Sequence, residues 1–407
     1  MYFQLAWRNI WRNPRRTAVI MTAIIIGVWS MVFLNTLMRG MEVDMIKNSI
    51  STLTGHLQIH HKDYRNDPVI ENSMYDTQTL ETALNKVLPT GANRAARIRV
   101  NAIVGNARHT GGITLVGINP AAEAKTSFIG HAINQDRYLE AEDKQGIIVG
   151  QALLVKFETK LGRKLIVMSQ DKDGNIASKA FRIIGTYQSQ LQATEKQFAF
   201  VNIDTARQML KLKKGISEVS ITLPDHIDAA QITAGLKAEL GTDGYQIQTW
   251  QELLPIINAY LVIFDGFIFI WSLVVFIAMG FGIVNTTLMA VFERMREFGL
   301  LKALGMKPWW IIRDVLSESF ILLIMGMIIG NLMALLCVFA LSESGIDLSA
   351  FAEGAEFAGI SKIIFPSVHL KDVLLSNLVV VILGLLVSLY PAFKAAKFTP
   401  VEALAQT

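Results

Sequence analysis

The sequence predicts an α-helical membrane protein with four transmembrane helices and a large mixed α/β extracytoplasmic domain. Of its 407 residues, 52% are hydrophobic and only 18% are charged, whereas soluble domains carry about 25% charged residues. Ordinary glycine and proline contents and a single cysteine exclude collagen-like, disordered and disulfide-scaffold classes. The net charge of +4 would be compatible with binding of nucleic acid. The basic residues, however, lie beside long apolar runs, as they do at the ends of membrane spans. We therefore expect membrane lipid, and no nucleic acid, as a partner.

Four stretches are long and apolar enough to cross a bilayer, which takes roughly 20 helical residues. We predict these spans at residues 17–38, 263–292, 311–341 and 373–393. Buried helices of a soluble protein are disfavoured, because they rarely stay almost free of charge for so long. A cleaved signal peptide is disfavoured for the first span, since its apolar stretch exceeds the usual length of about 7–15 residues and no small-residue cleavage site follows it.

Lysine and arginine beside the spans set their orientation, since these residues gather on the cytoplasmic side. Four arginines and no acid precede the first span, and four basic residues lie between the second and third spans, with Arg313 following at the start of the third. By contrast, residues 342–372 carry only Lys362 and Lys371 as basic residues. We predict both termini in the cytoplasm, including a tail at 394–407, with residues 39–262 and the short loop at 342–372 on the outer side.

Residues 1–16 are predicted to form an amphipathic helix on the cytoplasmic face. Arginines take one side of this helix, and apolar residues recur at helical spacing on the other, a pattern typical of helices in the headgroup layer. These apolar residues are Phe3, Trp7, Ile10 and Trp11. The alternative is a simple extension of the first span, but Asn13-Pro14 favours a break.

Residues 39–262 have the composition of a mixed α/β domain. Runs of β-branched and aromatic residues predict strands at 56–60, 97–104, 112–116, 165–168, 181–184, 197–201 and 219–223, and helical patterns occur at 78–87, 151–161, 205–211 and 229–240. Asp173-Gly174-Asn175 predicts a hairpin turn between two of these strands. We expect one composite unit, with two lobes divided near 119–138 or 188–196 as the alternative.

Little in this segment indicates catalysis. His56, His60 and His61 lack a cysteine or carboxylate at ligand spacing, so we predict surface histidines and no metal site. Neither a nucleophile elbow nor a phosphate-binding P-loop occurs in the sequence. We therefore predict no catalytic site and no cofactor on this chain. Mid-membrane ionisable residues, which mark ion pathways, are essentially missing from the spans, so a gradient-driven transporter is disfavoured.

Small residues at four-residue spacing predict close helix packing on two spans. They are Ala278 and Gly282 on the second span, and Gly326, Gly330 and Ala334 on the third. The spacing leaves open whether their neighbours belong to this chain or to a partner.

Residues 293–310, between the second and third spans, are predicted to form a short amphipathic helix. Glu293, Arg296 and Glu297 lie at helical spacing, and Phe298, Leu301 and Leu304 form an apolar stripe. Such a helix suits docking into a groove of a cytosolic partner. The alternative is a positively charged loop that lies on lipid.

The run from Glu293 to Gly305, ERMREFGLLKALG, resembles the FtsX-like permease family of ABC transporters, which includes MacB and the Lol permeases. The run at 390–404 and the openings at 5–10 and 15–17 also look like these permeases, and short runs at 148–152, 161–162, 181–185 and 249–250 are similar to the MacB-type periplasmic core. The C-terminal motif includes Pro391, Ala392, Ala395 and Pro400. The resemblance implies that ATPase coupling rests on Glu293, Arg294, Arg296, Glu297, Phe298, Gly299, Leu301, Lys302, Ala303, Leu304 and Gly305.

The same resemblance implies a permease subunit of the bacterial inner membrane. It would pair with a second permease, identical or different, and with two copies of a separate ABC ATPase that binds ATP and Mg. The ATPase domain that MacB carries has no counterpart in this sequence, so the layout is closer to the Lol permeases. ATP binding would push the coupling helix, and the motion would pass through the first two spans to the outer domain, a mechanism called mechanotransmission.

Several cargoes are compatible with this resemblance. Release of lipoproteins or related amphiphiles is favoured, with a periplasmic chaperone or adaptor as a further partner. Efflux of drugs, peptides or other exported substrates and control of a cell-wall hydrolase are alternatives. From a different class, the chain would be a receptor or scaffold, which would be favoured if altering Glu297 and Gly305 left the hydrolysis of a copurified ATPase unchanged.

The first span is testable by a charge at its centre. We expect Ile25→Arg to cost about 2.5–3.5 kcal/mol of insertion free energy, and therefore to reduce the amount of protein in the membrane fraction. A membrane yield and activity equal to those of the wild type would show that the span is misplaced.

Overall fold

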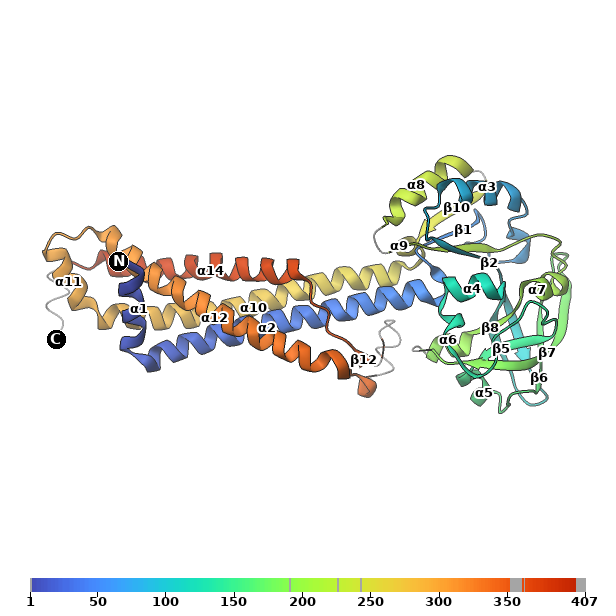
Figure 1. Ribbon diagram of the computed structural model, residues 1–407, viewed down its shortest axis with the longest axis horizontal. Helices are drawn as coiled ribbons and strands as arrows, with labels where there is room; N and C mark the ends of the chain where they lie inside the picture. Colours follow the sequence, from blue (N-terminus) through green and yellow to red (C-terminus); the bar gives the residue numbers. More distant parts are fainter. Residues whose placement is uncertain are drawn as a thin grey trace. The chain divides into compact units, whose positions relative to one another are not determined.

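A computed structural model describes residues 2–189, 192–224, 227–241, 244–351, 361 and 363–399 (Figure 1). The chain divides into two compact units. The helical unit comprises Met1–Val43, Leu261–Asp347 and Ile363–Thr407, and the α/β unit comprises Asp44–Tyr260 and Leu348–Lys362. Pro400 and the run at 401–407 lie outside the described residues, as do the side chain of Phe3 and residue 362.

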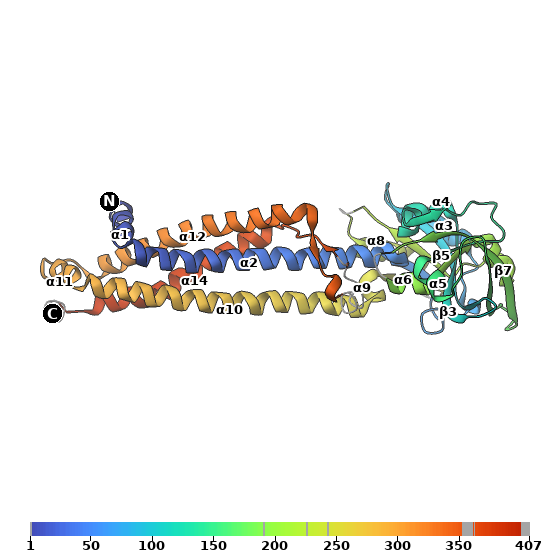
Figure 2. The same cartoon turned by 90° about the horizontal axis from the view of Figure 1, so that it is seen from below.

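Four helices of the described chain are long and apolar enough to cross a membrane, which confirms the predicted fold class. They are α2 (Pro14–Ser49), α10 (Pro255–Glu293), α12 (Pro308–Ser344) and α14 (Leu370–Lys397), and two shorter helices accompany them, α1 (Tyr2–Arg12) and α11 (Met295–Ala303). Figure 2 shows α2, α10, α12 and α14 as extended rods. Strands β11 (Ile346–Asp347) and β12 (Ile363–Ile364) pair with each other as a two-stranded antiparallel sheet.

The long helices extend beyond the predicted spans. The 39 residues of α10 measure about 58 Å at 1.5 Å per residue, against a hydrocarbon layer of about 30 Å. Backbone hydrogen bonding of a helix does not depend on apolar side chains, so each helix continues for several polar residues beyond its apolar span. The chain breaks at Asn13, between α1 and α2, where Asn-Pro stands in the sequence.

The small residues of α12 pack against α2 of the same chain. A Cβ atom added at Gly326 would lie 2.4 Å from Cγ2 of Ile24, and one added at Gly330 would lie 2.9 Å from Cβ of Val28. Ala334 is fully buried. On α10, Gly282 faces Ala23 of α2, at 3.5 Å from an added Cβ. Gly282, Gly326 and Gly330 thus have their neighbours within this chain. Ala278 is exposed instead, so the predicted close packing is not found for this residue within the chain: it lies on a side of α10 that no other described helix covers.

Polar side chains join the helices further along the spans. Asn331 of α12 and Asn377 of α14 exchange amide hydrogen bonds of 2.9 and 3.1 Å, and Asn35 donates to Ser376 Oγ at 3.1 Å. Arg39 contacts three carboxylates, one on each of α2, α10 and α14, namely Glu42, Asp265 and Asp372. Such pairs stabilise helix association in a membrane, where an unpaired polar group is costly.

The α/β unit is built on a ten-stranded sheet of order β10-β1-β9-β2-β3-β8-β5-β7-β4, with β6 paired to β2 and β7. The β3–β8 and β5–β7 pairs are parallel and the others antiparallel. The strands are β1 (Leu57–His61), β2 (Asn93–Gly105), β3 (Thr110–Ile118), β4 (Ile133–Asp136), β5 (Gly146–Gly150), β6 (Lys164–Gln170), β7 (Ile176–Tyr187), β8 (Phe198–Asn202), β9 (Glu218–Thr222) and β10 (Tyr245–Thr249).

Two apolar cores cover opposite faces of this sheet. Ile113 and Leu115 of β3 enter one core, and Val116 and Ile118 enter the other, as alternation along a strand requires. The helices of the unit are α3 (Thr77–Val87), α4 (Pro120–Thr126), α5 (Gln151–Lys156), α6 (Gln192–Gln197), α7 (Ile203–Met209), α8 (Ala229–Leu240) and α9 (Trp250–Leu253). The unit is therefore one compact body with a core on each face of its sheet.

The predicted hairpin at Asp173-Gly174-Asn175 is confirmed, since Gln170 of β6 pairs with Ile176 of β7. The predicted helix at 151–161 is too long. It ends at Lys156, because Glu158 adopts a left-handed backbone with φ +46°, which an α-helix cannot include.

The packing of α12 on α2 is testable with a single methyl group. We expect Gly326→Ala to destabilise the protein by about 1–3 kcal/mol, since the added Cβ overlaps the branched side chain of Ile24. Thermal unfolding of the purified protein measures this effect. Gly266→Ala on α10 is the matched control, because a Cβ there meets nothing within 4 Å, and its melting temperature is expected to stay equal or rise slightly. Equal melting temperatures for the two variants would contradict the packing.

Candidate functional site

Seven charged side chains gather where α1, α2, α10, α11 and α12 meet, and we call them the arginine cluster. Arg294, in the turn between α10 and α11, is its centre. Its guanidinium donates to Glu297 at 3.3 Å, to Glu318 at 3.1 Å and to Asp314 at 3.1 Å. Arg294, Glu318 and Asp314 have side chains that are at most 17% exposed. The full cluster is Arg12, Arg16, Glu293, Arg294, Glu297, Asp314 and Glu318.

Two further arginines extend this cluster to the N-terminal helices. Arg16 of α2 donates to Glu293 at 3.1 Å and to Glu318 at 3.3 Å. Arg12 of α1 donates to Glu297 at 2.6 Å. Charges that leave water are costly unless they are paired, and each charge of the cluster has an opposite partner. The cluster therefore attaches α11 to the end of α1 through Glu297, and the turn before α11 to α12 through Arg294, while Arg16 joins the start of α2 to α10 and α12.

Partial burial alone would raise the pKa of the Glu297 carboxyl. The hydrogen bond and charge of Arg12, followed by those of Arg294, outweigh it and lower this pKa below its ordinary value. The contacts of ionised Glu297 are thus present at neutral pH and are lost as the pH falls through the lowered pKa.

An apolar core lies beneath the arginine cluster. Phe298 is only 3% exposed and packs with residues of α10, α12 and α14, and the guanidinium carbon of Arg294 lies 4.9 Å from the centre of its ring. Ala392 and Ala395 of α14 are fully buried in this core, and Pro391 is buried as well. The small residues of the C-terminal motif thus leave room for α11 to approach α14.

Lys302 and Gly305 complete the attachment of α11. Lys302 Nζ donates to the carbonyl oxygens of Ala396 and Phe398, each at 2.6 Å, at the C-terminal end of α14, where a cation is favourable. Gly305 has φ +93° and follows α11, with bonds from Gly305 N to Lys302 O and from Met306 N to Leu301 O. This is a Schellman motif, which favours glycine at the left-handed position.

The remaining apolar residues of this segment form an exposed patch. Leu300 is 56% exposed, Leu304 78% and Trp309 64%, and Leu301 is also exposed. We call these four residues the α11 patch. The predicted stripe of Phe298, Leu301 and Leu304 is therefore divided. A helix turns about 100° per residue, so the stripe is wide enough for Phe298 to face the core while the two leucines face outward.

Helix α1 packs on α12 and places its two indoles outward. Trp7 and Trp11 are 47% and 54% exposed, whereas Ile10 is fully buried. Ile10 was predicted on the lipid-facing side, and this was wrong, because it packs into the core formed with α2, α10, α12 and α14. An amphipathic helix that rests on a bundle must bury part of its apolar face there.

Comparison with known proteins decides the family. Residues 17–239 match the family described as MacB-like periplasmic core domain, and residues 268–400 match the FtsX-like permease C-terminal family. The chain belongs to the FtsX-like ABC transporter permeases.

Relatives of this permease cover nearly its whole length. It is 23% identical over 403 residues to the lipoprotein-releasing system transmembrane protein LolC of Neisseria meningitidis serogroup B, covering 95% of this chain and 93% of that protein. It is 22% identical to LolE of Haemophilus influenzae, covering 99% and 98%. Against the macrolide export ATP-binding/permease protein MacB of Escherichia coli K12, identity is 23%, covering 99% of this chain and 60% of that one.

A solved structure is also similar to part of the permease. The periplasmic region of MacB from Actinobacillus actinomycetemcomitans aligns with 51% of this chain and 95% of its own length, at a TM-score of 0.37 and 14% identity.

Asp314 and Glu318 pair with Arg16 and Arg294, and these ion pairs were not predicted from the sequence. Asp314 and Glu318 stand near one end of the third span in the sequence, opposite in charge to the arginines that precede the first span. That complementarity was a signal for their pairing. Which arginine meets which acid depends on how the helices pack, so the pattern alone did not select Arg16 and Arg294.

The histidines of the α/β unit differ from expectation. His60 is 3% exposed, and its ring nitrogens lie 3.2 Å from His61 O and 3.1 Å from Gln248 Oε1, so the prediction of a surface histidine was wrong for this residue. It occupies a central strand between β10 and β9, where both faces are covered. Among the described residues, no group of three or more His, Cys, Asp or Glu is placed to hold a metal ion.

The arginine cluster is testable at its centre. We expect Arg294→Gln to lower stability by about 1–3 kcal/mol, because it leaves Asp314 without an ionic partner among the described residues. The melting temperature and the protease resistance of the segment around α11 measure this loss. Arg296→Gln is the matched control two residues away, since Arg296 is exposed. If both variants melt at the wild-type temperature, the cluster does not hold α11.

Proposed function

We propose that this permease couples ATP hydrolysis by separate ATPase subunits to a movement of its periplasmic domain, and that it thereby releases lipoproteins or related amphiphiles from the inner membrane. Its assembly would contain two ATPase copies, which bind ATP and Mg, and a second permease. Both termini and α11 would lie in the cytoplasm, and a periplasmic chaperone or adaptor would receive the cargo.

The α11 patch is the observation that carries this proposal. Leu300, Leu301, Leu304 and Trp309 expose apolar surface on a segment in which Arg294 and Glu297 are already paired within the permease. A helix with an exposed apolar face suits a groove on another protein. Of the coupling residues expected from the resemblance, Arg294, Glu297, Phe298 and Lys302 hold α11 in place. The leucines remain for the partner.

The attachments of α11 supply a route for motion. The arginine cluster joins Glu297 of α11 to Arg12 of α1, the helix directly before α2, and it joins Arg16 of α2 to Glu293 at the end of α10, next to the turn that carries Arg294. Both α2 and α10 continue in sequence into the α/β unit, α2 as far as Ser49 and α10 from Pro255. A displacement of α11 would therefore act on both chain segments that lead into that unit. The spans offer few polar groups to a crossing substrate, which favours a cargo that stays on the outer side.

The names of the relatives favour lipoprotein release over the alternatives. LolC and LolE are components of lipoprotein-releasing systems, and this permease aligns with nearly their full length. Macrolide export by MacB supports efflux as the second candidate.

Docking through the α11 patch is testable with one charge. We expect Leu304→Glu to reduce copurification of the ATPase and permease-stimulated ATP hydrolysis tenfold or more. An unpaired carboxylate buried in an apolar contact costs more than the roughly 1.4 kcal/mol that equals a factor of ten. Leu370→Glu is the matched control, since Leu370 is a leucine of similar exposure, 70% against 78%, at the start of α14.

Normal hydrolysis in the Leu304→Glu variant would refute docking at this patch. Equal loss in both variants would point to a general effect of a new charge and would also count against it.

A further inference from the structure

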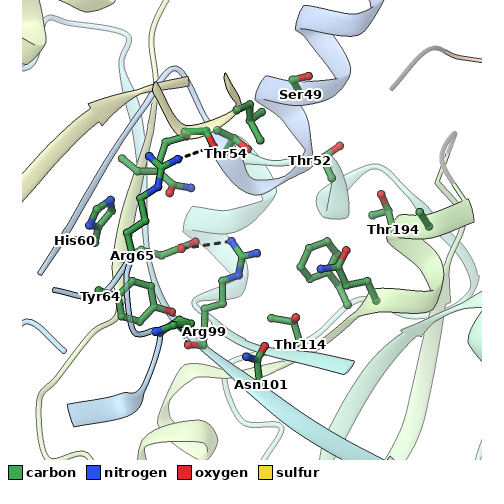
Figure 3. Close-up of a pocket in the computed structure, with 18 of the residues that line it drawn as sticks. Ser49, Thr52, Thr54, His60, Tyr64, Arg65, Arg99, Asn101, Thr114 and Thr194 are labelled. Atoms are coloured by element: carbon green, nitrogen blue, oxygen red, sulfur yellow. Dashed lines mark hydrogen bonds and ion pairs between the residues drawn. The ribbon is translucent and has the colours of Figure 1, made fainter. Parts of the chain in front are cut away.

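A cavity of about 530 Å³, lined by both polar and apolar side chains, opens within the α/β unit (Figure 3). Ligand pockets of proteins measure about 300–1,000 Å³. The cavity is lined by the last turn of α2 and the segment after it, by β1, β2 and β3, and by the α9–α10 junction. The proposed coupling to an ATPase through α11 does not involve this cavity.

Two arginines give this cavity its charge. Arg99 of β2 extends toward the middle of the cavity (Figure 3), where its guanidinium carbon lies 5.5 Å from the centre of the Phe198 ring. Its ionic contact to Glu218 measures 3.7 Å, which is longer than a hydrogen bond. Arg65 donates to the carbonyl oxygens of Glu252 and Leu253, which are uncharged.

The carboxylate of the cavity wall is already shared. Glu218 also accepts from the buried Arg97 at 3.2 Å, but Glu123 accepts two shorter hydrogen bonds from Arg97, of 2.9 and 2.8 Å. Glu123 and Glu218 therefore balance Arg97 and Arg99, and Arg65 has no carboxylate partner in the lining. Arg65 and Arg99 against Glu218 leave the lining with an excess of one positive charge. The side chain of Arg99 lines the cavity and is 33% exposed, and its planar guanidinium can bind the oxygens of a phosphate or carboxylate in pairs.

Neutral polar groups and an apolar wall complete the lining. Thr52, Asn101 and Thr114 surround Arg99 (Figure 3) with groups that donate hydrogen bonds to oxygen. Leu253, Leu254 and Ile257 form an apolar wall, adjacent in sequence to the second span. The cavity thus offers an anion site and an alkyl site side by side.

The cavity also touches a strained connection. The chain leaves α2 through Ile50–Thr54, where Leu53 has φ +93°, a conformation that is costly for a side-chain-bearing residue. Arg97 and Gln58 both donate to the carbonyl oxygen of Leu53. Because Thr52, Thr54 and Gln58 line the cavity, a ligand there would contact the segment through which α2 enters the α/β unit.

We propose that this cavity binds the anionic head of a single-chain amphiphile, with the head on Arg99 and Arg65 and the first part of the alkyl chain along Leu253, Leu254 and Ile257. This inference deepens the proposed function and rests on it, because it names the chemical class of cargo. Binding is measured without an ATPase, whereas the proposed function is tested by ATPase coupling, so either can fail alone.

The test uses the full chain in phosphatidylcholine nanodiscs and an octyl phosphate probe with a photoreactive diazirine at the end of its chain. We expect labelled peptides to contain Leu253–Ile257, and unlabelled octyl phosphate to compete. Arg99→Gln is expected to reduce labelling about tenfold or more. The variant should fold, because Glu218 keeps its contact to Arg97, and its melting temperature checks this.

Arg108→Gln is the matched control, since Arg108 is 79% exposed and lies outside the cavity lining; its labelling is expected to equal that of the wild type. Octanol and inorganic phosphate serve as separate competitors. Competition by octanol equal to that of octyl phosphate would show that the head is not recognised. Equal competition by inorganic phosphate would show a small-anion site without an alkyl site. Either result, or unchanged labelling of a folded Arg99→Gln variant, would overturn the proposal.

Discussion

The pairing of charges around Arg294 is the interaction on which the account of this permease depends. Three arginines and four carboxylates meet at one end of the helical unit, in surroundings where an unpaired charge is expensive. Glu297 of α11 pairs with Arg12 of α1, and Arg294, directly before α11, pairs with Asp314 and Glu318 of α12, so a shift of α11 strains contacts at both places. Phe298 below and Lys302 at the end of α14 restrain it from the other sides. Without these contacts, α11 would be held only by the turns that connect it to α10 and α12; with them, it packs as part of the helical unit.

This arrangement explains the sequence run from Glu293 to Gly305 in physical terms. Most of its residues serve the permease itself: Arg294 and Glu297 pair with other helices, Phe298 fills the core, and Gly305 provides the left-handed turn that ends α11. Leu300, Leu301 and Leu304 provide the exposed apolar surface that is left for a partner. The small residues near the end of α14 contribute to the same contact, since Ala392 and Ala395 leave space for the side chain of Phe298. Two motifs far apart in the sequence are therefore two sides of one contact.

The four spans, the α/β unit and the family were predictable, because apolar length, strand composition and the run after the second span are local properties of the sequence. The inward turn of Phe298 and Ile10 was not, because both residues belong to amphipathic faces and only tertiary contacts decide which part of a face is covered. The burial of His60 follows from the position of β1 between β9 and β10, and strand order is not a local property. The roles of Asp314 and Glu318 likewise depended on helix packing.

The central claim is that α11 moves as one body with α2 when the ATPase acts. A pulsed electron spin resonance distance between labels at Ala303 of α11 and Val19 of α2, two exposed sites, tests it most directly. Cys337, the single native cysteine, is replaced by alanine, and the permease is measured with its copurified ATPase, with and without trapped ATP. The account predicts the same distance distribution in both states. A shift of several ångströms on ATP binding would show that α11 moves independently of α2 and would contradict the account.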